Sequence, residues 1–270
     1  SPIAVRSAVV SVTEIVTLGV GVTATDVSAA FFDAKKVPTH TLEMISGYCE
    51  LYLFSELSLT CGNSCGDEEV CDAEGACQPK PRPLSAGALQ FAGLTSDVTL
   101  VPNADFKYSA ASPLPSDDLF TPGSVVTLSA TGADVAPFSA TLIAPSEVSL
   151  NGNGVLQLKD DADLTVSWQE NLDGSMVEVL LQAGPSKAGD STIPPTGIIY
   201  CWAPESAGGV VIPKEMIAKF PYQAGQLELP WPSFIRRMNR KFVETNTGTL
   251  DFIMRSQTNL VFTHTAIEVP

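Results

Sequence analysis

The chain has 270 residues, enough for one large or two medium domains with a hydrophobic core. Apolar residues make up 44% of it and charged residues 17%, a balance that excludes a disordered chain. The net charge of −15 makes nucleic acid an unsuitable partner, because affinity for nucleic acid comes mostly from Lys and Arg. No uncharged apolar stretch reaches about 18 residues, so we expect no membrane span.

The opening segment predicts strands. Aliphatic residues occupy every second position and alternate with Thr and Gly over residues 16–22: Val16, Leu18, Val20 and Val22. This period of two gives a strand with one apolar face. An apolar strand at the start of a chain can complete the sheet of a neighbouring subunit, so these four residues are candidate assembly contacts. Segments 27–32 and 48–54 continue the strand pattern.

The chain contains six cysteines, four of them in the Gly-rich loop 61–77: Cys49, Cys61, Cys65, Cys71, Cys77 and Cys201. An even number with a dense cluster predicts disulfides and an oxidising compartment. Two pairs within the loop and a third between Cys49 and Cys201 is one of many pairings that the count allows. A structural zinc site is the alternative, although the loop lacks the paired C-x2-C knuckles of zinc ribbons. The start at Ser1-Pro2 fits an exported chain whose signal peptide has been removed.

Two acidic loops are candidate calcium sites. The cysteine loop contributes Asp67 and Asp72, and a second loop contributes Asp160, Asp161 and Asp163. Carboxylate oxygens suit calcium, but neither loop has the EF-hand spacing, and a plain solvated turn is the favoured interpretation of each loop. Calcium is therefore the one cofactor that the sequence allows us to name.

Beyond the cysteine loop, the Pro-rich connector 78–83 is too stiff to join the centre of a sheet. Strand-like segments then follow at roughly ten-residue spacing, which is typical of sandwiches and barrels. Pro213 and the helix formers of 214–220 predict one short helix. The predicted strands are 88–91, 98–101, 125–128, 138–143, 155–158, 164–168, 176–181, 198–202, 209–212, 250–254 and 260–264.

No catalytic constellation is evident. His40 and His264 are the two histidines, and neither lies in a sequence pattern that supplies a nucleophile and an acid. Trp168 and Trp202 lie within apolar strands and are expected in the core. Trp231, held between two prolines, is the candidate for an exposed aromatic platform. We therefore expect a protein that is not an enzyme.

The acidic chain has one dense basic cluster, formed by Arg236, Arg237, Arg240 and Lys241. Such a cluster is either a solvated strand or a basic patch that meets the acidic cysteine loop of another copy. Contacts of the second kind generate rings or filaments.

Several segments together resemble the uncharacterised exported β-rich proteins of myxobacteria and related deltaproteobacteria. They are the cysteine loop with its Pro-rich connector, Ser-Ala-Gly-Ala-Leu-Gln-Phe (85–91), Val-Thr-Leu-Val-Pro-Asn (98–103), Phe-Ser-Ala-Thr-Leu (138–142), Asp-Leu-Thr-Val-Ser-Trp (163–168) and Cys-Trp-Ala-Pro-Glu-Ser-Ala-Gly-Gly-Val-Val-Ile-Pro (201–213). The resemblance covers most of the chain. It implies a secreted or cell-surface location and sandwich domains, and it implies no catalytic residue.

These observations predict an all-β fold of two Ig-like β-sandwich domains, 1–144 and 145–270, with one short helix and the disulfide-rich loop. The expected function is that of a structural subunit in an extracellular or cell-surface assembly, joined by strand addition. The alternative is a secreted module that binds a surface glycan or protein. Self-association or another surface protein is the expected partnership.

Overall fold

The computed structural model describes residues 8–17, 20–34, 37–55, 61, 65–115, 117–152, 155–171, 173–183, 195–221 and 233–265, with the backbone alone at 264 and 265. Leu18 and Trp231 lie outside the described residues, as does the side chain of His264. Within the described ranges the secondary structure is almost entirely strand, which confirms the all-β prediction. None of the described helices is long and apolar enough to cross a membrane.

A large curved sheet is the centre of the fold, and nine of the described strands belong to it. They are β1 (Ala8–Thr17), β2 (Gly21–Phe31), β3 (His40–Ser46), β4 (Cys49–Phe54), β12 (Val155–Lys159), β14 (Met176–Ala183), β15 (Gly197–Pro204), β17 (Ser233–Thr245) and β18 (Gly248–Thr265). Their order is β2-β1-β18-β17-β14-β15-β4-β3, and β12 pairs with the end of β18. Strand β1 runs parallel to β18, whereas the other pairs along this path are antiparallel.

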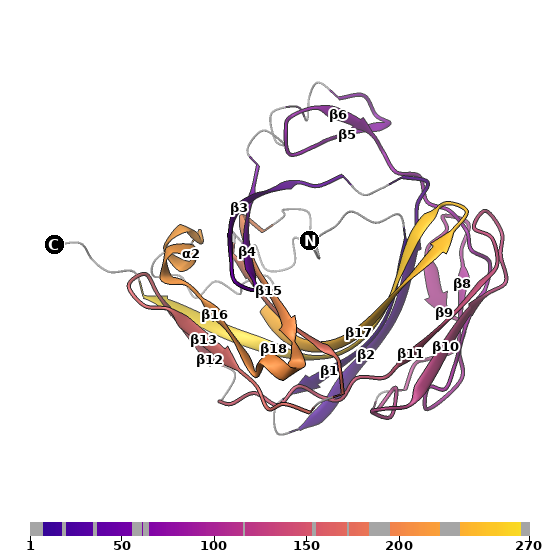
Figure 1. The fold of residues 1–270 in the computed structure, drawn as a ribbon. Helices are drawn as coiled ribbons and strands as arrows, with labels where there is room; N and C mark the ends of the chain where they lie inside the picture. Colours follow the sequence, from indigo (N-terminus) through magenta and orange to yellow (C-terminus); the bar gives the residue numbers. More distant parts are fainter. Residues whose placement is uncertain are drawn as a thin grey trace.

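Smaller elements cover the convex side of the large sheet (Figure 1). One is a five-stranded sheet of β7 (Leu89–Ala92), β8 (Val98–Pro102), β9 (Tyr108–Ala110), β10 (Val125–Ala130) and β11 (Phe138–Ile143). Another is the pair of β13 (Leu164–Ser167) with β16 (Gly209–Ile212), flanked by the 3-10 turn η2 (Glu205–Ala207) and the predicted helix, α2 (Lys214–Lys219). Pro213 precedes α2, and Phe220 ends it before Pro221.

Two hydrophobic cores lie between the large sheet and these covering elements. The first packs β1, β2 and the beginning of β18 against the five-stranded sheet. The second packs β4, β14 and β15 against β13, β16 and α2. Strand β18 contributes Phe252 to the first core and Leu260 to the second, so a single strand spans both.

The large sheet contains strands that precede residue 144 in the sequence and strands that follow it. Strands β1 to β4 precede this residue and β12 to β18 follow it, yet β1 pairs with β18 and β4 pairs with β15. The predicted boundary between 144 and 145 therefore does not divide the main sheet. The physical reason is the length of β18, which carries apolar residues for two cores along one face.

The opening segment forms a hairpin instead of the one continuous strand predicted over residues 16–22. Strand β1 ends at Thr17 and β2 begins at Gly21, so that Val16 pairs with Val22 across the turn. The Val20 N–H donates to the Thr17 carbonyl, and Gly21 has a φ of 97°, which favours glycine. Val20 is consequently at an exposed turn, and the alternation that predicted a strand passes through that turn.

The disulfide-rich segment forms a strap that joins the two edge regions of the large sheet. It contains the hairpin of β5 (Glu69–Cys71) and β6 (Cys77–Pro79). Beside the end of β4, the Ser55 hydroxyl donates to the Ala73 carbonyl at 2.5 Å. Beside the end of β2, the Asp33 N–H donates to the Arg82 carbonyl at 3.0 Å, and Arg82 forms an ion pair with Asp33. Figure 1 shows the strap passing above the concave side of the sheet, and we call residues 65–83 the strap.

Candidate binding site on the concave face of the large sheet

The concave face of the large sheet carries the main candidate site. The residues of the two cores take one set of alternate positions on each strand, so the other set faces the concave side. Strand register aligns that second set in rows across the sheet. One row runs from the turn after β3 to β1, through Tyr48, Trp202, Glu178, Arg236, Gln257 and Ile15.

The centre of the concave face is a buried network of charged and phenolic groups. Glu178 of β14 forms an ion pair with Arg236 of β17, and the Tyr200 hydroxyl of β15 donates to the same carboxylate. Arg240, four residues further along β17, pairs with Asp251 of β18. The sheet brings these groups together from four strands, although 58 positions of sequence separate Glu178 from Arg236.

Burial and charge set the proton affinities in this network. Burial opposes ionisation of Glu178, but the Arg236 guanidinium and the Tyr200 hydroxyl hold the pKa of Glu178 below its ordinary value. Burial, together with the adjacent Glu178 carboxylate, raises the pKa of Tyr200, so this phenol stays protonated and serves as a donor. The network therefore holds fixed charges, which suits recognition better than proton transfer.

Arg255 of β18 lies in the same network and has a different environment. Its buried Nε has no hydrogen-bond partner, and no acidic side chain among the described residues forms a salt bridge with it. Burial, followed by repulsion from Arg236, lowers the pKa of Arg255 to about 10. Thr13 of β1 and Met238 of β17 are its cross-strand neighbours on this face. Three guanidiniums and two carboxylates leave one surplus positive charge in the network.

An exposed apolar surface lies at the β3 end of the concave face. Leu42 and Ile45 of β3 oppose Tyr52 and Glu50 of β4, so they share the concave side. Tyr48 and Trp202 continue that surface, because the Trp202 N–H donates to the Tyr48 carbonyl. The exposed fractions are 48% for Leu42, 62% for Ile45, 50% for Tyr48 and 40% for Trp202. We call these four residues the β3 edge surface.

The prediction that Trp168 and Trp202 both lie in the core is confirmed for Trp168 and wrong for Trp202. Trp168 is buried in the second core and donates from Nε1 to the Glu205 carbonyl at 2.8 Å. Trp202 follows Cys201 on β15 and faces the opposite side, toward the concave surface. Trp202 lies in an apolar strand, and this suggested that it is buried. The side chains of a strand point alternately to its two faces, so only every second residue of β15 enters the core.

The predicted basic patch is not a surface patch. Arg236 and Arg240 face the concave side, where each pairs with an acidic residue. Arg237 faces the convex side, is only 1% exposed, and bonds to Glu205, to Ser146 and to the Gln169 carbonyl. Lys241 alone is exposed. The acidic partners come from other strands and from η2, which is why a local reading of the sequence found a cluster without counter-charges.

The candidate assembly strand is already paired within its own chain. Strand β1 lies between β2 and β18, and Val16 is buried there. Val22 belongs to β2, and Val20 lies at the turn. Since both edges of β1 are occupied by strands of the same chain, β1 does not offer a free strand for a neighbour's sheet, whereas β2 ends the sheet order and pairs with β1 alone among the described strands.

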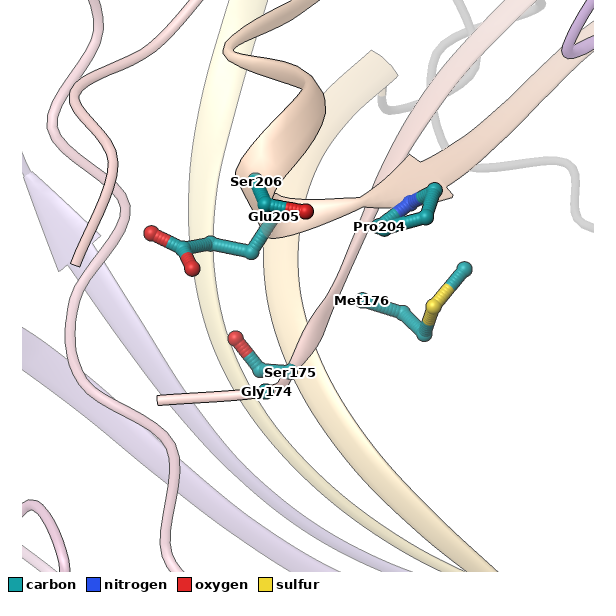
Figure 2. Close-up of a pocket in the computed structure, with 6 residues that line it drawn as sticks. All are labelled: Gly174, Ser175, Met176, Pro204, Glu205 and Ser206. Atoms are coloured by element: carbon teal, nitrogen blue, oxygen red, sulfur yellow. The ribbon is translucent and has the colours of Figure 1, made fainter. Parts of the chain in front are cut away.

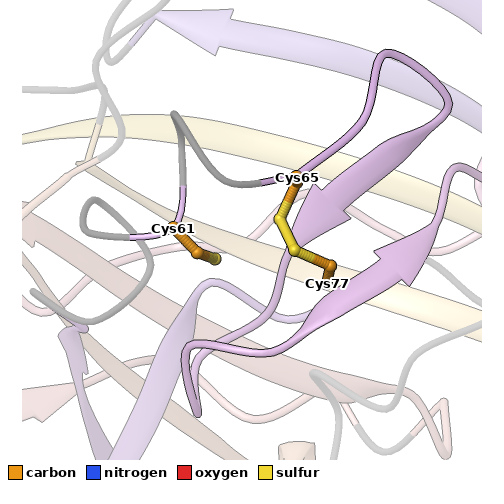
Figure 3. A group of neighbouring side chains, drawn as sticks. All are labelled: Cys61, Cys65 and Cys77. Atoms are coloured by element: carbon orange, nitrogen blue, oxygen red, sulfur yellow. A yellow bond between two sulfur atoms is a disulfide. The ribbon is translucent and has the colours of Figure 1, made fainter.

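All six cysteines form disulfides: Cys49–Cys201, Cys61–Cys71 and Cys65–Cys77. The first bond joins β4 to β15, and the other two brace the segment around the strap. The sulfurs of Cys61, Cys65 and Cys77 lie within 4.8 Å of one another (Figure 3), close enough for one metal ion. Zinc binds thiolates, however, and a sulfur in a disulfide is not a thiolate. The geometry thus favours the disulfide interpretation of the loop.

Among the described residues, the predicted calcium ligands make separate contacts and do not gather into one metal site. The Asp72 carboxylate accepts the N–H groups of Glu74 and Ala76 and the side-chain amide of Gln78. The Ala76 and Gln78 bonds hold the pKa of Asp72 below its ordinary value. Asp163 accepts the Lys214 N–H at 2.9 Å at the start of α2. Asp67, Asp160 and Asp161 do not join any group of three metal-ligating side chains among the described residues.

His40 lacks the surroundings of a catalytic base. Its Nε2 lies 2.8 Å from the Pro195 carbonyl oxygen, its Nδ1 lies 3.1 Å from the Thr39 hydroxyl, and its ring packs edge-on against Phe54. Burial lowers the pKa of His40, although the Pro195 carbonyl opposes this. No carboxylate orients this imidazole among the described residues, so its contacts are structural.

A small pocket of about 210 Å³ lies where β14 begins and β15 ends (Figure 2). It is lined by Gly174, Ser175, Met176, Pro204, Glu205 and Ser206. The Glu205 carboxylate is already engaged by Arg237 and by the Asn171 N–H. The pocket thus has one buried acid that serves a structural network, and none of its six described lining residues is basic.

The residues that sequence reasoning missed are charged positions inside apolar strands: Glu178 in β14, and Asp251 and Arg255 in β18. A charge within an otherwise apolar strand was the available signal, because burying a charge requires a partner. No protein-family model, curated protein or solved structure matches this chain.

Proposed function

We propose that this chain is a non-enzymatic subunit of an extracellular protein assembly, and that it binds an extended segment of a partner protein along β3. The observation that carries this proposal is the free edge of β3 beside the exposed β3 edge surface. Strand β3 ends the sheet order and pairs only with β4 among the described residues. Unpaired strand edges are templates for strand addition, and apolar positions beside them provide specificity.

The chemistry of the β3 edge surface favours a peptide over a glycan. Leu42 and Ile45 are aliphatic, and burying them against an incoming side chain contributes about 1–2 kcal/mol each. A sugar would use the aromatic Tyr48 and Trp202 but would gain little from two aliphatic side chains. The net charge of −15 opposes self-association and favours a basic partner. Three disulfides support an oxidising location outside the cytoplasm.

The test uses synthetic octapeptides that alternate Val with Lys, with Val-Glu and proline-interrupted peptides for comparison. Fluorescence anisotropy would measure binding to the wild type and to the double variant Leu42→Ser/Ile45→Ser. Hydrogen exchange would show whether the amides of β3 become protected. The matched control is Val125→Ser/Ile143→Ser, an exposed cross-strand pair on the five-stranded sheet.

We expect the Val-Lys peptide to bind and to protect β3, and the Leu42→Ser/Ile45→Ser variant to bind about tenfold or more weakly. The control variant should bind like the wild type. Binding without protection of β3, or equal losses in both variants, would contradict strand addition. Binding of glycans in an array with no binding of any extended peptide would replace this proposal with the glycan-binding alternative.

A further inference from the structure

We infer that the concave face contains a subsite for one carboxylate group of a ligand, and that Arg255 is its anchoring residue. The site is separate from the β3 edge surface. Three strand spacings separate β15, which carries Trp202, from β18, which carries Arg255; this is about 14 Å. The subsite does not depend on strand addition to β3.

The Arg255 guanidinium differs from its neighbours in its contacts. Its Nε is buried and has no hydrogen-bond partner in the part of the chain that the structure describes, while the neighbouring Arg236 and Arg240 each have an acidic partner. Glu178 and Asp251 attract this guanidinium through space, but neither forms a salt bridge with it, and a buried donor without a hydrogen bond destabilises the fold. Such a destabilising group is retained in a protein where a ligand supplies the missing partner, so that folding stability is given up for binding.

Arg255 faces the side of the large sheet that the described elements cover less. The covering sheets and α2 pack on the convex side, whereas the strap with β5 and β6 passes above the concave side and, in the described contacts, touches the large sheet beside the ends of β4 and β2. Arg255 points to that side, with Thr13 opposite it on β1 and Gln257 two residues further along β18. The Thr13 hydroxyl and the Gln257 amide are donors that can complete the hydrogen bonding of an oxyanion.

The charges around Arg255 favour a carboxylate ligand. Within the network, Arg236, Arg240 and Arg255 leave a surplus of one positive charge over Glu178 and Asp251, while Asp26, opposite Thr13 on the same face, is exposed and two strands away from Arg255. One carboxylate neutralises this surplus, whereas a doubly charged phosphate would face repulsion from Glu178 and Asp251 without a second cation. The planar fork of a guanidinium also matches a carboxylate with two parallel hydrogen bonds.

The test measures thermal unfolding of the full chain in sodium acetate, sodium glucuronate or sodium phosphate, against sodium chloride at equal ionic strength. We expect acetate and glucuronate to raise the Tm of the wild type by about 2 °C at concentrations several times above Kd. Arg255→Met should be at least as stable as the wild type in chloride and should lose the carboxylate-dependent shift. Arg255→Lys keeps the charge without the fork and should retain a smaller shift.

Two controls separate this subsite from the rest of the surface. Lys241→Met removes an exposed cation outside the network, and it should keep the full shift. Leu42→Ser/Ile45→Ser should keep it too, so failure of the β3 proposal leaves this one standing. An equal shift in the wild type and Arg255→Met would overturn the inference, as would a phosphate shift as large as that of acetate. Loss of stability in Arg255→Met without any carboxylate effect in the wild type would assign Arg255 a purely structural role.

Discussion

Cys49 and Cys201 lie directly opposite each other on the antiparallel strands β4 and β15, with their Cα atoms 4.0 Å apart. Their disulfide links positions separated by 152 residues, one from each half of the chain. Both cysteines are fully buried, and the next residues outward in the same ladder are Tyr48 and Trp202 of the β3 edge surface. This bond therefore fixes β4, and through it the edge strand β3, to the centre of the large sheet.

Removing this bond should be the most destabilising single disulfide loss. The double variant Cys49→Ala/Cys201→Ala should lose about 4–5 kcal/mol of unfolding free energy, because the bond closes a long loop in the unfolded chain. Urea unfolding under oxidising conditions measures the loss. Cys65→Ala/Cys77→Ala, which opens a loop of 12 residues, should lose about 2–3 kcal/mol. Equal losses in the two variants would contradict the account.

The Glu178–Arg236 pair should behave as a buried ion pair. Removing one partner leaves an uncompensated charge, so Glu178→Gln or Arg236→Met should cost about 3–5 kcal/mol each. Glu178→Met/Arg236→Met should cost less than the sum of the single variants, with a coupling energy of about 1–3 kcal/mol. Lys219→Met is the control for an exposed pair and should cost under about 1 kcal/mol. Additive effects in the double-mutant cycle would show that the two residues do not depend on each other.

Glu14 predicts a pH dependence of stability. Its carboxylate on β1 accepts the N–H groups of Leu119 and Phe120, and burial raises its pKa from 4.5 despite these bonds. A group whose folded pKa is raised contributes stability that is fully present below its unfolded pKa. That stability is lost as pH rises through the folded pKa.

Glu14→Gln keeps a carbonyl acceptor for both N–H groups and removes the titration. The stability of the wild type relative to Glu14→Gln should therefore fall as pH rises above about 4.5, and at pH 7 the variant should be as stable as the wild type or more so. Urea unfolding of both proteins at several pH values measures the difference between their free energies of unfolding. The contributions of the other carboxylates cancel in this difference. A difference that stays constant with pH would show that Glu14 has no raised pKa.

Asp72 should hold the turn of the strap without calcium. Asp72→Ala removes three hydrogen bonds, so the amides of Glu74 and Ala76 should exchange with solvent about tenfold or more faster, while those of β14 stay unchanged. Asp67→Ala is the control, since the described contact of Asp67 in the strap is through its backbone carbonyl. Chelation by EDTA should not change the wild-type exchange. If calcium slowed exchange across residues 66–78, the acidic loop would be a calcium site after all.

Much of the architecture was predictable because it depends on local patterns. Alternation at period two predicted the strands, Pro213 and its following residues predicted α2, and the even number and dense cluster of cysteines predicted disulfides. The hairpin between β1 and β2 was missed because Val16, Leu18, Val20 and Val22 alternate through the turn. Local periodicity does not reveal where a glycine reverses the chain.

The sequence by itself determined an all-β chain, cross-linked by disulfides, whose strands each have one apolar face. Only the tertiary structure decided which charges meet. Arg236, Arg237 and Arg240 are close in sequence, yet adjacent residues of a strand face opposite sides, so Arg236 and Arg240 meet Glu178 and Asp251, while Arg237 meets Glu205. Arg255 remains the unpaired member because the strand order places three guanidiniums beside two carboxylates. That order follows from long-range strand pairing, which no short sequence window contains.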